Sequence, residues 1–229
     1  MYQKKNRKRV RGIYGTYETR KWNDAVDIYY YEKKRGGKFF LSKCLEESRE
    51  RGTVFNSSLV SSSQENLWTE AGWEACHHLY LYNLFFNKET PVQESKKVVG
   101  CVKLKQEHFE KIVSIDKEIF DPYWRSSFLT LLDTLNSCKE TVLYEYQDKG
   151  RLLAYALVGI TMRSSFLQRF AVHPETQGLG VGSLVLENIL SDMVKGEMIS
   201  MKLNTQKENF AAQKLYEKKG FSLSKESLS

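Results

Sequence analysis

The sequence has few of the residues that mark several protein classes. Only 3 prolines and 14 glycines occur in 229 residues, and the hydrophobic (41%) and charged (28%) fractions are ordinary, which excludes a low-complexity or disordered chain. No apolar run reaches the ~18 residues that a membrane-spanning helix needs, so we expect no such helix. The basic stretch from Met1 to Arg9 has no apolar run behind it, which argues against a secretory signal.

Cysteine is also scarce. The four cysteines, Cys44, Cys76, Cys101 and Cys138, lie far apart and form no CxxC pair. Their spacing fits neither a disulfide framework nor a zinc site, and no other cluster has metal-ligand spacing. We therefore expect a cytoplasmic protein that uses no metal.

Positive charge exceeds negative charge and is concentrated at one end. The chain has 35 Lys+Arg against 28 Asp+Glu, a net charge of +7. Six of the cations lie within the first eleven residues, namely Lys4, Lys5, Arg7, Lys8, Arg9 and Arg11. We predict that these residues form a solvated, mobile tail, and the alternative is a weak contact with nucleic acid or another anionic surface.

Apolar spacing and a polar break divide the chain. Residues 87–98 around Pro91 predict a linker, which gives two regions, 1–95 and 96–229. The second region shows the element order β-α-α-β-β-β-α-β-α-β, which predicts an α/β fold with a mixed sheet and helices on its faces. Its strands are expected at 99–104, 141–146, 152–162, 166–172, 198–203 and from 221, and its helices at 106–120, 126–135, 181–194 and 209–219.

The clearest chemical signal follows the strand expected at 166–172. A glycine-rich loop, Gln177 to Ser183, leads into an amphipathic helix. Glycines let the backbone turn tightly and approach a ligand, while the unpaired first amides and the dipole of a helix favour a pyrophosphate. Taken alone, such a loop also fits a helix entry that binds no ligand.

A second motif makes the signal more specific. Gln177 to Gly182 resembles the Q/R-x-x-G-x-G/A acyl-CoA signature of the GNAT (general N-acetyltransferase) superfamily, and Asn209 to Phe221 resembles its N-x-x-A-x-x-L-Y-E-K-x-G-F motif. The resemblance covers about Val99 to Phe221. It implies a mixed, mainly antiparallel sheet and an acetyl-CoA-dependent N-acetyltransferase. Such an enzyme transfers acetyl directly to a primary amine of a small molecule, peptide or protein.

The resemblance also implies roles for single residues. The backbones of Phe170 and Val172 and the side chain of Asn209 would bind the pantetheine arm. Tyr216 would be the general acid that protonates the leaving thiolate, because a phenol with a pKa of about 10 can donate to a thiolate near ~8.5; the alternative is a packing aromatic. The loop would hold the CoA pyrophosphate through Gln177, Gly178, Leu179, Gly180, Val181, Gly182 and Ser183.

The general base usual in the family is missing. Its glutamate is expected about seven residues before Ala171, where this chain has Ser164. Glu145 is our first candidate for the base, and the others are Glu118, Asp121 or a chain of water molecules. The alternative for Glu145 is a solubilising carboxylate on an exposed strand.

The segment Phe120 to Ser126 is predicted to contact the acceptor. Tyr123 and Trp124 offer a large apolar surface, and Asp121 or Glu118 could hold an ammonium group. The segment loosely resembles the aromatic-rich segment of enzymes that acetylate protein N-termini, including those of ribosomal proteins. His173 is interpreted as a turn residue at the entry to the glycine-rich loop.

The first 95 residues contain no catalytic motif but suggest an internal repeat. Strands expected at 27–31, 53–60 and 78–86 alternate with helices at 38–51 and 64–70, the order seen from 166 onward. We hypothesise a degenerate GNAT-like half-domain, although an unrelated small α/β segment is the alternative. In this alignment Glu32 takes the place of Gln177 and Trp68 that of Tyr216, so this half should not bind acyl-CoA in the same way.

The second region ends one strand short of the family's usual sheet. The N-terminal half, or a second subunit in a homodimer, would then cover the open edge.

Two alternative functions remain open. One is a non-catalytic acyl-CoA-binding or regulatory protein, since the usual base is absent. The other is a nucleic-acid-binding module acting through the basic tail and Tyr29 to Tyr31, which steep salt dependence of binding would reveal.

Overall fold

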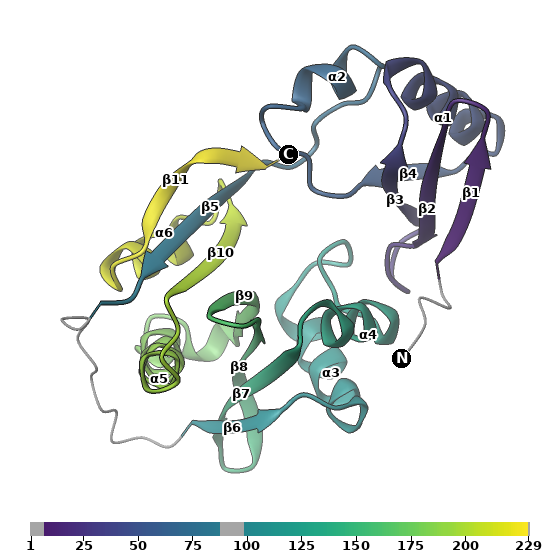
Figure 1. Cartoon of the computed structure of the whole chain (residues 1–229). Coiled ribbons are helices and arrows are strands. Elements are labelled where there is room, and N and C mark those ends of the chain that lie inside the picture. The colour runs from purple at the N-terminus through teal and green to yellow at the C-terminus, as the bar shows by residue number, and fades with distance from the viewer. Residues whose placement is uncertain (1–6, 88–98, 229) are drawn as a thin grey trace. The chain divides into compact units, whose positions relative to one another are not determined.

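The computed structural model describes residues 7–87 and 99–228 and divides into two compact units (Figure 1). One unit comprises the chain up to Tyr80 together with the segment from Lys225, and the other comprises Leu81–Ser224. The predicted boundary between residues 95 and 96 lies outside the described residues.

The first unit is a four-stranded sheet with two helices. Its strands lie in the order β1-β2-β3-β4, where β1–β2 and β2–β3 are antiparallel and β3–β4 is parallel. Aromatic side chains dominate its core, including Tyr17, Tyr31, Phe40, Trp68 and Trp73. The elements are β1 (Lys8–Gly12), β2 (Gly15–Lys21), β3 (Ile28–Arg35), α1 (Lys38–Glu50), β4 (Val54–Ser57) and α2 (Glu65–Thr69).

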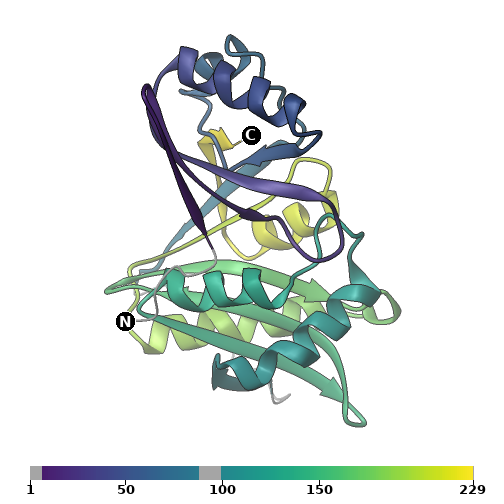
Figure 2. The ribbon, with the colours of Figure 1, turned by 90° about the vertical axis from the view of Figure 1, so that its right-hand side faces the viewer.

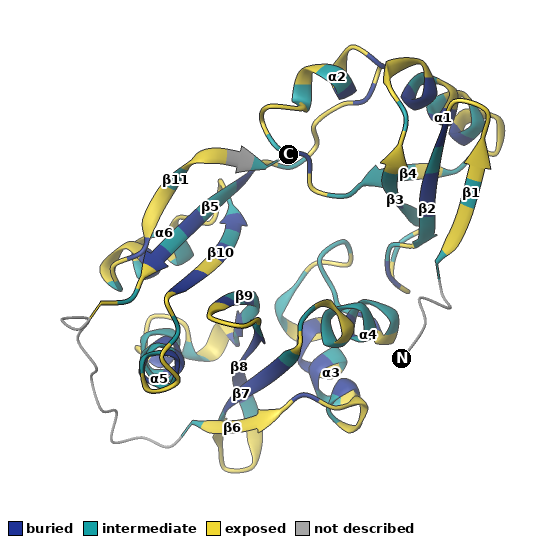
Figure 3. Cartoon of the chain, in the orientation of Figure 1, coloured by how far each residue is buried: buried dark blue, intermediate teal, exposed yellow. Residues whose placement is uncertain are grey.

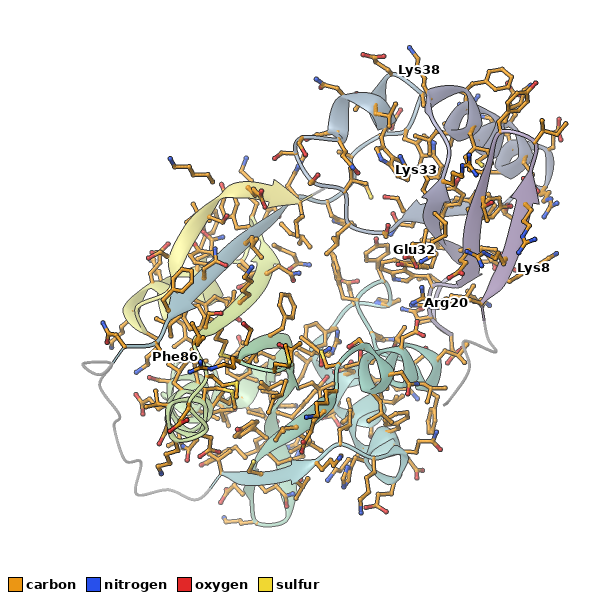
Figure 4. The ribbon with its side chains drawn as sticks, viewed as in Figure 1. Lys8, Arg20, Glu32, Lys33, Lys38 and Phe86 are labelled. Carbon is orange, nitrogen blue, oxygen red and sulfur yellow. The ribbon has the colours of Figure 1, made fainter. Side chains whose placement is uncertain are left out.

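The expected order of elements from residue 27 onward is confirmed, but the prediction of a mobile basic tail is wrong for residues 8–11. They belong to β1, which pairs with β2 and sets Val10 opposite Tyr17. The other side chains of β1 are exposed, and Lys8 points outward in Figure 4. A strand that buries so little shows no apolar alternation, so the pattern that normally predicts strands is missing here. Lys4 and Lys5 lie outside the described residues.

The second unit contains a seven-stranded sheet in the order β11-β5-β10-β9-β8-β7-β6. Strands β6 to β9 are antiparallel neighbours, and β9 and β10 are parallel. Its strands are β5 (Leu79–Phe85), β6 (Gly100–Lys103), β7 (Glu140–Asp148), β8 (Arg151–Ile160), β9 (Ser164–Val172), β10 (Ser200–Gln206) and β11 (Ser222–Leu228). The α/β class and the mainly antiparallel sheet flanked by helices are confirmed.

Helices cover both faces of this sheet (Figure 2). Leu143, Tyr155 and Leu157 point to the face covered by α3 and α4, where they share a core with Ile112. The neighbouring Tyr144 points to the opposite face, where its hydroxyl donates to Asp192 of α5. The helices are α3 (Phe109–Ile119), α4 (Phe128–Ser137), α5 (Val181–Lys195) and α6 (Phe210–Lys218), with 3-10 turns at Gln106–His108 and Pro174–Thr176.

Strand β5 precedes the described part of the second region, yet it completes the second unit's sheet. It lies between β10 and β11, and its middle is buried at Tyr82 and Leu84 (Figure 3). Just past its end, the Phe86 N–H donates to the Ile199 carbonyl at 2.9 Å (Figure 4). The strand expected at 78–86 is therefore confirmed, and it supplies the strand that the C-terminal sequence lacks. It does so from inside the sheet, since β11 forms the outer edge.

Candidate active site

Strands β9 and β10 run side by side over only part of their length. Their pairing joins Ser164 to Ser200 at one end and Leu167 to Leu203 at the other. Beyond these residues β9 continues to Val172 and β10 to Gln206, and the two strands do not pair further within the described chain. The backbone groups of the diverging halves can therefore bind an extended ligand, much as an added strand would bind.

A β-bulge in β9 coincides with the point of divergence. The consecutive β8 residues Leu157 and Val158 pair with Arg169 and Leu167, which leaves Gln168 without a partner on β8. A bulge bends its strand and increases the local twist, which accounts for the turn of β9 away from β10. The Gln168 side chain lies over Gly159 of β8, where an added Cβ would be 2.9 Å from the Gln168 Cδ. Gly159 thus leaves room for the bulge.

The glycine-rich loop follows β9 directly. Gly178 (φ +77°) and Gly180 (φ +83°) adopt left-handed backbone, and a Cβ at either residue would meet no atom within 4 Å. Glycine adopts this backbone without strain, so the loop turns tightly and leaves open space beside it. The side chain of Gln177 donates to the Val172 carbonyl at 3.0 Å and ties the loop to the end of β9.

Helix α5 begins at Val181 with no side-chain cap at Gly180. Its first amides are therefore available to an anion, and the helix dipole favours negative charge there. A Cβ at Gly182 would lie 3.5 Å from the Val172 Cγ2 and 3.8 Å from the Phe170 Cζ. The start of the helix is thus packed against the diverging half of β9, and the predicted loop and strand residues come together here.

Tyr216 lies on α6 and is only 5% exposed. Its ring contacts those of Tyr82 and Phe221, with centroids 6.1 and 5.9 Å away. Burial raises the pKa of its hydroxyl well above the ordinary value. The phenol therefore stays protonated at neutral pH, which is the state that a general acid requires.

Asn209 caps the helix that carries Tyr216. Its Oδ1 accepts a hydrogen bond from the Ala212 N–H at 3.1 Å. The cap occupies the Oδ1 of this exposed side chain, so the Asn209 Nδ2 is the atom that could donate to a ligand.

Glu145 lies on β7, two strands from β9 in the sheet order. The expected alternative of an exposed carboxylate is wrong, since Glu145 is 9% exposed. Its Oε1 lies 2.6 Å from the Nζ of Lys111 on α3. The ion pair holds the Glu145 carboxylate on the face covered by α3 and α4.

The other candidate carboxylates lie at the end of α3 and just beyond it. Arg151 donates to Glu118 at 3.0 Å, and the His173 Nε2 lies 3.1 Å from the same oxygen; these contacts lower the pKa of Glu118. The Nδ1 of His173 accepts from the Glu175 N–H, which confirms its interpretation as a turn residue. Asp121 accepts from the backbone of the next turn within the predicted acceptor segment.

The structure also reveals a polar network that the sequence analysis missed. Asp116 of α3 is fully buried and accepts from the Tyr155 hydroxyl and from the Arg169 Nη2, both at 2.5 Å. The Arg169 Nε donates to the Tyr155 oxygen at 2.7 Å. The sequence feature that could have revealed it is a charged residue at a position expected to be apolar. Asp116 follows the buried Ile112 by one helical turn, and Arg169 lies among the apolar residues of β9.

Two kinds of site are absent from the residues that the structure describes. No group of three or more His, Cys, Asp or Glu side chains could hold a metal ion there. No helix among the same residues is long and apolar enough to cross a membrane.

Comparison with known proteins agrees with this geometry. The family model described as "Acetyltransferase (GNAT) family" matches residues 109–221, which include the bulge, the loop and Tyr216. The ribosomal protein bS18 alanine N-acetyltransferase of Escherichia coli strain K12 is 28% identical over 78 residues, covering 34% of this chain and 53% of that protein. The chain thus spans about half the length of the curated relatives it matches.

Solved structures share the fold over nearly the whole chain. A GCN5-related N-acetyltransferase from Sphaerobacter thermophilus gives a TM-score of 0.62 at 13% identity, covering 93% of this chain and 75% of the other. A tandem GNAT protein from the clavulanic acid biosynthesis pathway gives 0.64 at 12% identity, covering 94% and 77%. Residues 109–221 of this chain therefore form a GNAT acetyltransferase domain.

Proposed function

We propose that the protein transfers an acetyl group directly from acetyl-CoA to a primary amine. The observation that carries this proposal is the opening between β9 and β10 next to an uncapped helix start and a buried tyrosine. The loop supports it as well, since its left-handed glycines leave open space where a diphosphate would lie.

The diverging half of β9 would hold the pantetheine arm. In this proposal the backbones of Phe170 and Val172 bind it, and Asn209 contacts it from the start of α6. The amides from Gly178 to Ser183 hold the pyrophosphate, with Gln177 keeping the loop in place. These groups bind and orient the thioester without contributing a charged side chain.

Acetyl-CoA supplies an activated thioester carbonyl. A β9 amide near Val172 would stabilise the negative charge that develops on the carbonyl oxygen as the amine nitrogen bonds to carbon. Tyr216 would donate its proton to the sulfur as the carbon–sulfur bond breaks. The burial that raises the pKa of this phenol would also raise the pKa of a thiol enclosed beside it, so proton transfer from the phenol to the thiolate stays feasible.

The acceptor amine must lose a proton, and we propose Glu145 as the first base to test. The ion pair with Lys111 at 2.6 Å supports this choice, because it holds the carboxylate in one position. Glu118 and Asp121 remain the second candidates. The low pKa of Glu118 makes it the weaker base, but it suits an ammonium-binding role.

We propose a peptide or protein N-terminus as the preferred acceptor class. The bS18 alanine N-acetyltransferase match supports an α-amine. The half-buried rings of Tyr123 and Trp124, which meet edge to face at 4.8 Å, give the segment an apolar surface for a peptide. A cytoplasmic location is proposed as well, since all four cysteines are free thiols.

The proposal is tested by incubating the full chain with acetyl-CoA and an amine panel, with products read by mass spectrometry. The panel comprises peptides with free N-terminal alanine, their N-blocked copies and small primary amines. We expect a single 42-Da acetyl addition (approximate mass of C2H2O) to a free-amine peptide, dependent on acetyl-CoA and reduced in Tyr216→Phe. Tight acetyl-CoA binding without transfer to any amine would instead favour the non-catalytic acyl-CoA-binding alternative.

A further inference from the structure

The polar network of Asp116, Tyr155 and Arg169 contacts more than its own members. The Arg169 Nη2 donates to the Trp124 carbonyl at 2.8 Å, and the Asp116 Oδ2 accepts from the Ser126 N–H at 2.9 Å. Both contacts are to backbone atoms of the segment Phe120 to Ser126, so they fix the path of the chain between α3 and α4.

The same guanidinium also contacts the start of this segment. Its Cζ lies 4.3 Å from the centroid of the Phe120 ring, within the range of a cation–π interaction. One side chain of β9 therefore holds the segment at Phe120 and at Trp124. Within the segment itself, Arg125 donates to the Phe120 carbonyl at 2.9 Å.

Arg169 occupies a particular place on β9. It is the first residue after the bulge and the residue before Phe170, whose backbone faces the opening between the strands. Its side chain points to the face covered by α3, toward Asp116. A single residue thus joins the proposed thioester-binding strand to the segment predicted to contact the acceptor.

Burial makes this arrangement rigid. Asp116 and Tyr155 are both fully buried, and the Arg169 guanidinium keeps its charge because Tyr155 and Asp116 outweigh the cost of desolvation and raise its pKa. A buried charge pair with satisfied hydrogen bonds has few alternative arrangements, since any displaced partner would be left without compensation.

We propose that Asp116, Tyr155 and Arg169 are positioning residues for acceptor recognition. They hold the segment from Phe120 to Ser126 against β9 and thereby set where the acceptor amine meets the thioester, without touching acetyl-CoA. This inference rests on the proposed transfer reaction and adds a determinant of acceptor specificity to it.

A matched pair of variants tests the proposal. Tyr155 and Tyr144 are both buried in the same sheet, and each donates one hydrogen bond to a carboxylate, Asp116 or Asp192. Tyr155→Phe removes a bond of the network, while Tyr144→Phe removes an equivalent bond on the opposite face. Arg169→Lys, which keeps the charge but loses the planar fork, is the second network variant.

Four quantities are measured in the full chain: the acetyl-CoA affinity, the KM and the kcat for the best amine of the panel, and the rate of native-state tryptic cleavage after Arg125. We expect Tyr155→Phe to raise the amine KM by about tenfold, the loss of one hydrogen bond to a charged group, and to speed cleavage. The acetyl-CoA affinity should stay unchanged, and Arg169→Lys should show the larger effect. Tyr144→Phe should leave all four quantities near those of the unmodified chain.

The outcomes separate this inference from the proposed function. Equal amine KM values and equal cleavage rates in Tyr155→Phe and Tyr144→Phe, with transfer intact, would overturn the positioning role alone. A fall in acetyl-CoA affinity equal to the change in amine KM would also overturn it. An unmodified chain that acetylates no amine contradicts the proposed function, and the cleavage rates then still show whether the network holds the segment.

Discussion

Both units contain a parallel β-α-β segment, but the connections from the first strand to the helix differ. In the first unit β3 and β4 pair in parallel around α1, and in the second β9 and β10 do so around α5. Two residues, Gly36 and Gly37, join β3 to α1, whereas the segment from His173 to Gly180 joins β9 to α5. The longer connection creates the loop that an anion could enter.

The start of α5 also has more free space around it than the start of α1. A Cβ at Gly36 would lie 2.4 Å from the Phe40 ring, while a Cβ at Gly180 would meet nothing within 4 Å. In the first unit, aromatic rings dominate the core. Trp68, which the repeat alignment matched to Tyr216, packs edge to face on Trp73 at 5.0 Å. Two segments with the same order of strand, helix and strand therefore differ in the space at their helix starts, because one connection is longer and no side chain fills it.

The largest expected effect comes from removing the first unit together with β5. A chain that begins at residue 99 loses β5 and leaves the facing edges of β10 and β11 unpaired. It also loses the buried side chains of Tyr82 and Leu84, worth roughly 1.5–3 kcal/mol each. We expect it to be unfolded or aggregated by circular dichroism and size-exclusion chromatography, whereas a chain that begins at residue 77 should keep the sheet. A folded, fully active 99–229 chain would show that β5 is dispensable.

The second prediction compares one glycine in each unit. Gly180 and Gly52 both have positive φ and open surroundings, so Gly180→Glu and Gly52→Glu should each lose about 1 kcal/mol of stability. Only Gly180→Glu places bulk and negative charge in the proposed pyrophosphate site. At 100 times the Kd, acetyl-CoA should stabilise the unmodified chain and Gly52→Glu by about 2.7 kcal/mol, seen as a higher Tm, and should leave Gly180→Glu unchanged. A shift of equal size in both variants would exclude this loop as the binding site.

The third prediction concerns the two aligned aromatic residues. Tyr216→Phe should lower kcat by about 100-fold, the usual contribution of a general acid, with little change in stability. Trp68→Phe should destabilise the first unit and leave kcat unchanged. Since the pKa of Tyr216 is raised by burial, the rate should not fall with rising pH until above the ordinary tyrosine value of about 10. A kcat in Tyr216→Phe equal to that of the unmodified chain would remove the residue from the reaction.

The smallest effect is expected from the base. Glu145→Gln should lower kcat by about tenfold to 100-fold near neutral pH, and high pH should partly restore it, since more of the acceptor amine is then deprotonated. The measurement is a pH–rate profile of Glu145→Gln beside Glu118→Gln. A profile for Glu145→Gln that matches the unmodified chain, with a change only in Glu118→Gln, would assign the base to Glu118.

Local patterns predicted much of the second unit. The helices carrying the two motifs lie where apolar spacing placed them, and the left-handed turn at Gly220 (φ +87°) ends the last one as expected. The loop and Tyr216 could be recognised because each lies within a short contiguous motif. Strand β1 could not, because its charged, exposed side chains carry no apolar period.

Contacts between residues far apart in the chain could not be predicted from the sequence. The strand at 78–86 was visible from its composition, but no local pattern states that it inserts between β10 and β11. The Asp116–Arg169 pair could not be predicted either. In the sequence each residue is an isolated charge among apolar neighbours, and only the fold places the Arg169 Nη2 2.5 Å from the Asp116 Oδ2. Both features depend on contacts between residues far apart in the chain.

The stoichiometry of acetyl-CoA binding tests the contrast between the two units most directly. Isothermal titration of the full chain should show one acetyl-CoA per chain, lost in Gly180→Glu and retained in Gly52→Glu. Two molecules per chain, or one molecule that still binds to Gly180→Glu, would contradict this assignment, since acetyl-CoA would then bind at a place other than the loop before α5.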